Sequence, residues 1–242
     1  SAAGGTVTFA STLNGGQSLD ITAGTAGDVL FQSVVGGTAR LGAITITSAD
    51  DVTAPAITAA SLVQTSGSGT TTLNGAVNTN TATGVNLTTN NITLGAITVD
   101  TRVGNGVARF NAPTLLGSGD VTVTAGSGNI TFENTVNGGY ALTLNSAGTE
   151  RFNGAVGSTT ALTSITTDAP GTVEFNGGSV RTTGAQTYND AAVLVSDTSL
   201  YTTGSSAAGA NVTFASTLNG GQSLGITAGT AGDVLFQSVV GG

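Results

Sequence analysis

A long internal repeat restricts the fold of this chain more than any other feature. Residues 1–37 return almost unchanged as residues 206–242, at an offset of 205 residues. The two copies differ at three pairs of positions: Gly5 and Ala210, Thr6 and Asn211, and Asp20 and Gly225. Periodic sequences are typical of quasi-one-dimensional stacks, in which each repeat contacts only its neighbours. We therefore interpret 1–205 as one full tandem unit and 206–242 as the start of the next, continuous with the same stack.

A shorter period lies inside the long unit, and the eight phenylalanines mark it. Several of them are 20 to 23 residues apart, each in a segment of alternating apolar and polar residues. Where phenylalanine is absent, Ala54, Leu73, Leu94 and Leu194 take the equivalent place. We predict that most of these side chains stack in one interior column, formed by Phe9, Phe31, Leu73, Leu94, Phe110, Phe132, Phe152, Phe175, Phe214 and Phe236.

The local pattern within each short repeat indicates β-strands joined by tight turns. Apolar residues alternate with Thr, Ser or Asn, which is the period of a half-buried strand. Asn-Gly and Gly-Gly pairs separate the strands, as at 14–16 and 137–139, and glycine supplies the positive φ that tight turns need. Only 7% of the residues are charged, and Val, Thr, Ile and Leu are frequent, so we expect an ordered, all-β chain.

Strands this short bury their apolar side chains only when one repeat stacks on the next. The sequence therefore predicts a parallel β-helix, or β-solenoid, with about 20–21 residues per coil and roughly eleven to twelve coils. At about 4.8 Å per coil, one unit would rise roughly 50 Å. A sandwich and a propeller fit the regular spacing less well. The segments 48–60 and 182–203 fit it poorly, and we expect loops or irregular coils there.

The sequences of the short repeats resemble those of a known family. Strings such as TVTFASTLNGGQSLDITAG, NITFENTVNGGYALTLNSAG and TTGAQTYNDAAVLVSDTSL are similar to the repeats of filamentous-haemagglutinin-like exoproteins. These are very large bacterial adhesins, exported by two-partner or related type V secretion. The resemblance covers essentially the whole chain and implies a right-handed parallel β-helix exposed outside the cell. The N-terminal secretion domain of that family is not evident here.

Few kinds of catalysis are open to this composition. The chain has no histidine, cysteine or lysine, which excludes the usual Ser-His pair, a thiol nucleophile, a Schiff base and His/Cys zinc sites. Asp50-Asp51 is the only adjacent acid pair, and a solvated turn is its simplest interpretation. Asp20 is replaced by Gly225 in the second copy, and Glu133 has no evident partner acid. We predict no catalytic residue, no cofactor and no metal ligand.

Weaker patterns point to structural roles or stay open. The segments 15–20 and 117–123 match a calcium-binding β-helix repeat only in part, so regular calcium sites are not expected, whereas an isolated site stays open. Asparagine comes directly after the predicted interior residue at positions 74, 111, 153 and 176. These asparagines could form a ladder of side-chain amides along the stack, or simply begin turns. The five arginines could pair with nearby acids such as Glu150. Tyr140, Tyr188 and Tyr201 are too scattered to predict a carbohydrate platform.

Charge and hydropathy restrict the partners and the location. A net charge of −8 disfavours nucleic acid and anionic membranes, and no apolar run approaches the roughly 18 residues of a membrane span. No signal peptide opens the chain, yet the repeats indicate a secreted, bacterial cell-surface protein. The expected partners are further units of the same chain, identical neighbouring chains, and glycans.

We therefore expect a non-enzymatic, structural segment of a surface filament or extracellular matrix fibre. One alternative is the stalk of an adhesin whose binding domain lies elsewhere. Another is a polysaccharide-active β-helix enzyme, which would need a cluster of acids on one face of the solenoid.

Overall fold

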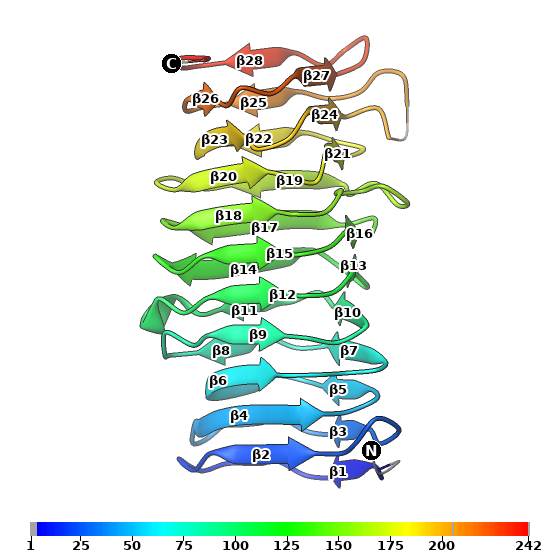
Figure 1. The fold of residues 1–242 in the computed structure, drawn as a ribbon, viewed down its shortest axis with the longest axis vertical. Helices are drawn as coiled ribbons and strands as arrows, with labels where there is room; N and C mark the ends of the chain where they lie inside the picture. Colours follow the sequence, from blue (N-terminus) through cyan, green and yellow to red (C-terminus); the bar gives the residue numbers. More distant parts are fainter. Residues whose placement is uncertain (1–3, 205, 242) are drawn as a thin grey trace.

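The chain forms a parallel β-solenoid of about ten turns in the computed structural model, which describes residues 4–204 and 206–241. The strands form three ladders along the rod, which we call faces A, B and C in the order that the chain visits them (Figure 1). Stacked partners such as Val7 and Val29, or Ile92 and Thr114, are 22 residues apart. Many of the turns are thus slightly longer than the predicted 20–21 residues.

Face A begins at the first strand and continues to the C-terminal end of the rod. Isolated bridges through Val156 join its lower part to its upper part. Its strands are β1 (Val7–Phe9), β3 (Val29–Phe31), β5 (Val52–Ala54), β7 (Thr70–Leu73), β10 (Asn91–Leu94), β13 (Thr114–Leu116), β16 (Val136–Asn137), β21 (Ser179–Arg181), β24 (Thr198–Tyr201) and β27 (Leu224–Thr227).

Faces B and C form one sheet of 18 strands that bends between them. Face B starts with bridges between Leu13, Val35 and Ile57. Its strands are β8 (Val77–Thr79), β11 (Thr98–Asp100), β14 (Val121–Gly126), β17 (Ala141–Ser146), β19 (Ser164–Thr167), β22 (Gln186–Tyr188), β25 (Val212–Phe214) and β28 (Val234–Phe236). The strands of face C are β2 (Leu19–Thr22), β4 (Leu41–Ser48), β6 (Ile57–Gln64), β9 (Val85–Leu87), β12 (Ala108–Phe110), β15 (Ile130–Phe132), β18 (Thr149–Phe152), β20 (Thr172–Phe175), β23 (Ala191–Leu194) and β26 (Leu218–Asn219). A 3-10 turn, η1 (Arg102–Gly104), follows β11.

The two segments for which loops were predicted are regular parts of the stack, so that prediction is wrong. Residues 48–60 contain β5 and the start of β6, and residues 182–203 contain β22, β23 and β24. Their side chains alternate between buried and half-buried, as in Val52–Ala54 and Gln186–Tyr188. The pattern was hard to detect because alanine, threonine and glutamine fill interior places that leucine or phenylalanine fill elsewhere.

The aromatic side chains occupy three interior stacks instead of the single column that we predicted. Phe9 stacks on Phe31 in face A, with ring centroids 4.9 Å apart. Face C holds the longest stack, and face B holds a third. The last ring in face C, Phe175, meets Tyr188 in face B edge-on, with ring centroids 5.0 Å apart. The stack in face C is Phe110, Phe132, Phe152 and Phe175, and the one in face B is Tyr188, Phe214 and Phe236. Leu73 and Leu94 are buried in face A.

The phase of the long repeat explains this distribution. Nine steps along face A lead from Val7 to Leu200. Val212, the equivalent of Val7 in the second copy, comes one face later, in face B. Leu19 in face C likewise returns as Leu224 in face A. One unit therefore makes nine turns and about one third of another, and the second copy is rotated by one face.

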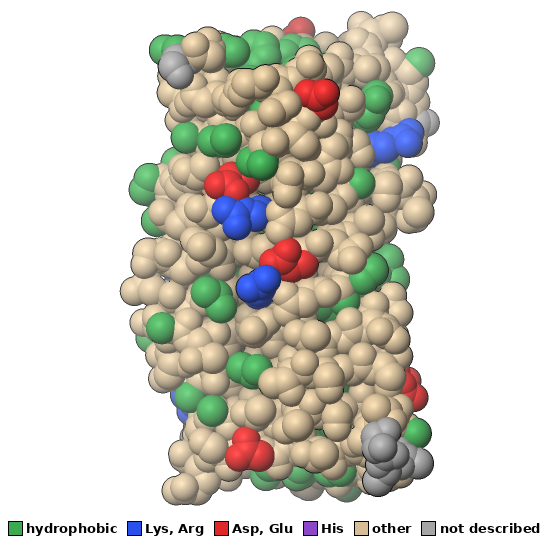
Figure 2. Space-filling view, in the orientation of Figure 1, with side chains coloured by type: hydrophobic (Ala, Val, Ile, Leu, Met, Phe, Trp, Pro, Cys, Tyr) green, Lys and Arg blue, Asp and Glu red, His purple; other side chains and the backbone are tan. Residues whose placement is uncertain are grey.

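The outer surface is mostly uncharged and polar. Figure 2 shows scattered hydrophobic side chains on the viewed side of the rod and few charged ones, including blue and red side chains next to one another near its middle. Ion pairs join Arg109 to Glu133 and Arg151 to Glu174, each at 2.5 Å, across neighbouring turns of face C. Exposed ion pairs of this kind stabilise a fold by under about 1 kcal/mol.

Candidate functional site

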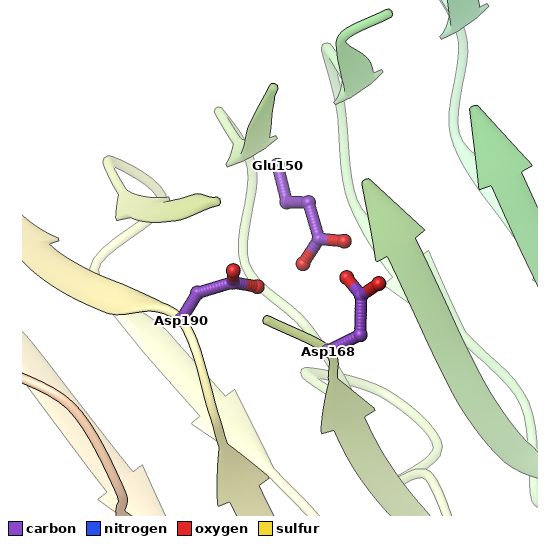
Figure 3. A group of neighbouring side chains, drawn as sticks. All are labelled: Glu150, Asp168 and Asp190. Atoms are coloured by element: carbon purple, nitrogen blue, oxygen red, sulfur yellow. The ribbon is translucent and has the colours of Figure 1, made fainter. Parts of the chain in front are cut away.

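Three carboxylates from successive turns converge at the corner between faces B and C. Glu150 belongs to β18 in face C, Asp168 follows β19 in face B, and Asp190 lies between β22 and β23. One carboxylate oxygen of each lies within 4.8 Å of those of the other two. Figure 3 shows the three carboxylates pointing toward one another from separate turns of the chain.

Glu150 occupies a place in the stack that apolar residues hold above and below it. Its partners in the neighbouring turns of face C are Ile130 and Val173. Residues at i and i+2 of a strand share a face, so the interior position of Phe152 also directs Glu150 inward. The alternation in Thr149–Phe152 was therefore the signal that could have found this residue.

The expected pairing of Glu150 with an arginine is wrong for the same reason. Its side chain is fully buried, whereas the neighbouring Arg151 points outward and pairs with Glu174. The other arginines also have partners elsewhere. Arg102 pairs with Asp100, Arg109 with Glu133, Arg40 bonds to Ala59 and Asn78, and Arg181 lies over the ring of Tyr201.

Hydrogen bonds to the chain hold Asp168 but leave the other two acids unsatisfied. The Ser146 amide donates to Asp168 Oδ1 at 2.7 Å, and the Asp190 amide donates to Thr167 Oγ1 at 3.4 Å. Within the part of the chain that the structure describes, both carboxylate oxygens of Glu150 and both of Asp190 are buried without a hydrogen bond of good geometry. Buried polar atoms in this state are rare and call for an explanation.

The electrostatics of the trio favour a proton where no cation is present. Burial raises the pKa of Glu150 to about 10, and the negative charges of Asp190 and Asp168 add to that rise. Burial also raises the pKa of Asp190 to about 6, although the nearby Thr167 hydroxyl opposes this rise. Removing a carboxylate from water without compensation disfavours its charged form. These effects favour the protonated form of Glu150 at neutral pH in the ion-free protein.

Access to the trio suits a small ion or a proton better than a polymer. Glu150 is 0% exposed and Asp190 is 1% exposed, whereas Asp168 is half-buried and opens toward solvent. A glycosidase needs two carboxyl groups on either side of a bound sugar ring. Because Glu150 is fully buried, a sugar ring bound at the surface would not contact it in this structure.

Most of the other acids noted in the sequence accept hydrogen bonds from neighbouring turns. Asp50 and Asp51 lie in a turn, where Asp50 accepts a hydrogen bond from the Ser68 hydroxyl and Asp51 accepts one from the Thr70 amide at 2.7 Å. Asp20 is exposed on β2. Glu133 accepts hydrogen bonds from Asn153 and pairs with Arg109. None of these acids lies in the buried trio.

The asparagine side chains do not form a continuous hydrogen-bonded ladder along the rod. Asn176 donates to Asn153 Oδ1 at 3.2 Å, but Asn153 then donates to Glu133. Asn111 donates to Asn86 Oδ1 and Thr88 Oγ1 in the preceding turn. The three tyrosines do not make a common platform, because Tyr188 is fully buried in the core.

Comparisons of this chain with protein-family models, curated proteins and solved structures find no match. Within residues 4–204 and 206–241, no helix has the length and apolar character of a membrane span.

Proposed function

We propose that the chain is a structural segment of a long extracellular β-solenoid, which forms a surface filament or matrix fibre. The observation that carries this proposal is the continuity of the two copies. Strands β25, β26 and β27 of the second copy pair in parallel with β22, β23 and β24 of the first, one on each face. A further unit would extend the rod in the same way.

The last turn offers a surface suited to such extension. Phe236 stacks on Phe214 at 5.4 Å yet is 44% exposed, and Val234 and Val240 beside it are also exposed. These residues hold interior positions in the other turns, where a following turn covers them. Unpaired strand edges readily pair with another chain, and the next unit of the same protein is the occupant that preserves the ladders.

The composition of the outer surface supports a mechanical role. Few charges and many Thr, Ser and Asn side chains leave a neutral surface that can pack side by side with identical rods or bind glycans weakly. The resemblance to filamentous-haemagglutinin-like repeats is the reason for proposing an extracellular location. The stalk of an adhesin is the second candidate, and it uses the same rod with a distinct binding domain at one end.

Electron cryomicroscopy of a chain with at least three tandem units tests the proposal. We expect straight rods with layers about 4.8 Å apart and a unit length of about 45 Å, given the nine and one third turns per unit. Rods that associate laterally would support a fibre, and separate rods with a globular tip on the native protein would support an adhesin stalk. Compact particles in which the units do not stack would contradict both.

A further inference from the structure

Glu150, Asp168 and Asp190 form a buried trio of carboxylates, so every side-chain atom that could bind a metal ion there is an oxygen. We propose that these three carboxylates bind one Ca²⁺ ion inside the corner between faces B and C. The inference is independent of the proposed fibre, because it concerns a site within a single unit.

The arrangement of the oxygens matches a calcium ion. Hard cations take carboxylate and carbonyl oxygens, and Ca²⁺ binds them at about 2.3–2.6 Å. Two ligands on opposite sides of the ion are then about 4.6–5.2 Å apart. The three carboxylate oxygens lie within 4.8 Å of one another, so one ion can contact all of them. Mg²⁺ binds at about 2.0–2.1 Å in strict octahedral geometry, which irregular ligands from three turns suit less well.

Backbone carbonyl groups beside the trio can complete the shell. A side chain at Gly171 would place its Cβ 2.6 Å from Asp190 Oδ1, 2.3 Å from the Ser146 oxygen and 3.1 Å from the Gly148 oxygen. The Ser146 and Gly148 carbonyl oxygens therefore lie close to Asp190 Oδ1, and a side chain at position 171 would collide with all three oxygens. Ca²⁺ takes six to eight ligands, commonly including backbone carbonyls and water.

Charge and burial give the reason for a cation. The Glu150 and Asp190 carboxylates point into the trio, are almost fully buried, and make no hydrogen bond of good geometry within the described residues. No arginine among those residues offsets their charge. An apolar side chain would fit the stack at Glu150 at lower cost, since its neighbours there are Ile130 and Val173. A divalent ion compensates the buried charges, and the half-buried Asp168 gives it a path from solvent.

Calorimetric titration of CaCl₂ into the full 242-residue protein, stripped with a chelator, tests the site. We expect one ion per chain at this site and a higher unfolding temperature in CaCl₂ than in chelator, because a ligand that binds only the folded state stabilises it. Glu150→Gln and Asp190→Asn, which remove one ligand charge each, should weaken binding at least about tenfold. Asp120→Asn is the matched control, since Asp120 is an exposed acid whose carboxylate accepts from the Ala141 amide.

Several outcomes would overturn the assignment. These are no Ca²⁺ binding at millimolar concentration, equal binding by the wild type and both trio variants, and tighter binding of Mg²⁺ than of Ca²⁺. If the variants fail to fold, crystals of the wild-type protein grown with CaCl₂ decide the question. An anomalous peak among the three carboxylates is expected there, and an empty trio in those crystals would refute the site.

Discussion

Phe9 stacks on Phe31 in face A, whereas Phe214, its equivalent 205 residues later, stacks between Tyr188 and Phe236 in face B. The same sequence is thus used on two different faces of the rod. Because each unit adds about one third of a turn, a third copy would lie on face C, and a fourth would return to face A. Outward-facing groups of successive units would then follow a three-fold screw around the rod.

This rotation can be measured with a label on each unit. The chain has no cysteine, so Gln17→Cys in every copy of a three-unit protein gives one exposed labelling site per unit. We expect gold particles at three positions about 120° apart around the axis, with the full pattern repeating after about 135 Å. Labels in a single line along the rod would show that the unit contains a whole number of turns.

The interior stack in face C should dominate stability. Phe152 lies between Phe132 and Phe175, with ring centroids 5.7 and 6.5 Å away, and is fully buried. Phe152→Ala should cost about 3–5 kcal/mol of unfolding free energy, through lost burial and the cavity that remains. Phe9→Ala, in the half-buried first turn, should cost clearly less. Denaturant unfolding compares the two, and equal losses would contradict this account of the core.

The ion-free protein should lose stability as pH rises. Burial raises the pKa of Glu150 from its ordinary value of 4.5 to about 10 in the folded protein. Between these values the folded state keeps a proton that the unfolded state releases, so the free energy of unfolding falls with rising pH. Thermal unfolding in chelator from pH 5 to 9 measures this slope. Glu150→Gln should flatten it, and an unchanged slope in that variant would assign the effect to other groups.

An apolar replacement should separate stability from calcium binding. Glu150→Leu continues the ladder of Ile130 and Val173, so it should stabilise the ion-free protein by about 1–3 kcal/mol, because it removes a buried carboxyl group without a hydrogen bond of good geometry. The same variant should no longer gain stability from CaCl₂. Unfolding in chelator and in CaCl₂ checks both, and a retained calcium response would argue against Glu150 as a ligand.

Glycine is required at only some turns. Gly36 has φ of 70°, and a Cβ there would lie 1.9 Å from the Thr58 carbonyl oxygen, so Gly36→Ala should destabilise the protein by more than about 1 kcal/mol. Gly139 has open space around its Cα and no positive φ, which makes Gly139→Ala the matched control with little expected effect. Equal unfolding free energies for the two variants would contradict this reasoning.

Several elements of the fold could be predicted from local patterns. The alternation around Phe110, Phe132 and Phe152 identified buried positions, and all three are interior. The turn glycines keep the same conformation in both copies, with φ of 129° at Gly15 and 123° at Gly220, although the copies lie on different faces. Preferences of this kind depend on neighbouring residues alone, so a single short segment contains them.

Tertiary stacking alone decided which segments meet. Hydrogen-bonded neighbours in adjacent turns range from 18 residues apart, as at Thr65 and Thr47, to 26 apart, as at Ser223 and Asp197. These differences accumulate along the chain, so a regular spacing of phenylalanines could not say that they divide among three faces. The position of the buried trio depends on the same accumulated differences in turn length. Glu150, Asp168 and Asp190 converge because the lengths of the intervening turns bring them to one corner, whereas the sequence itself determined that each segment would be a short strand ending in a turn.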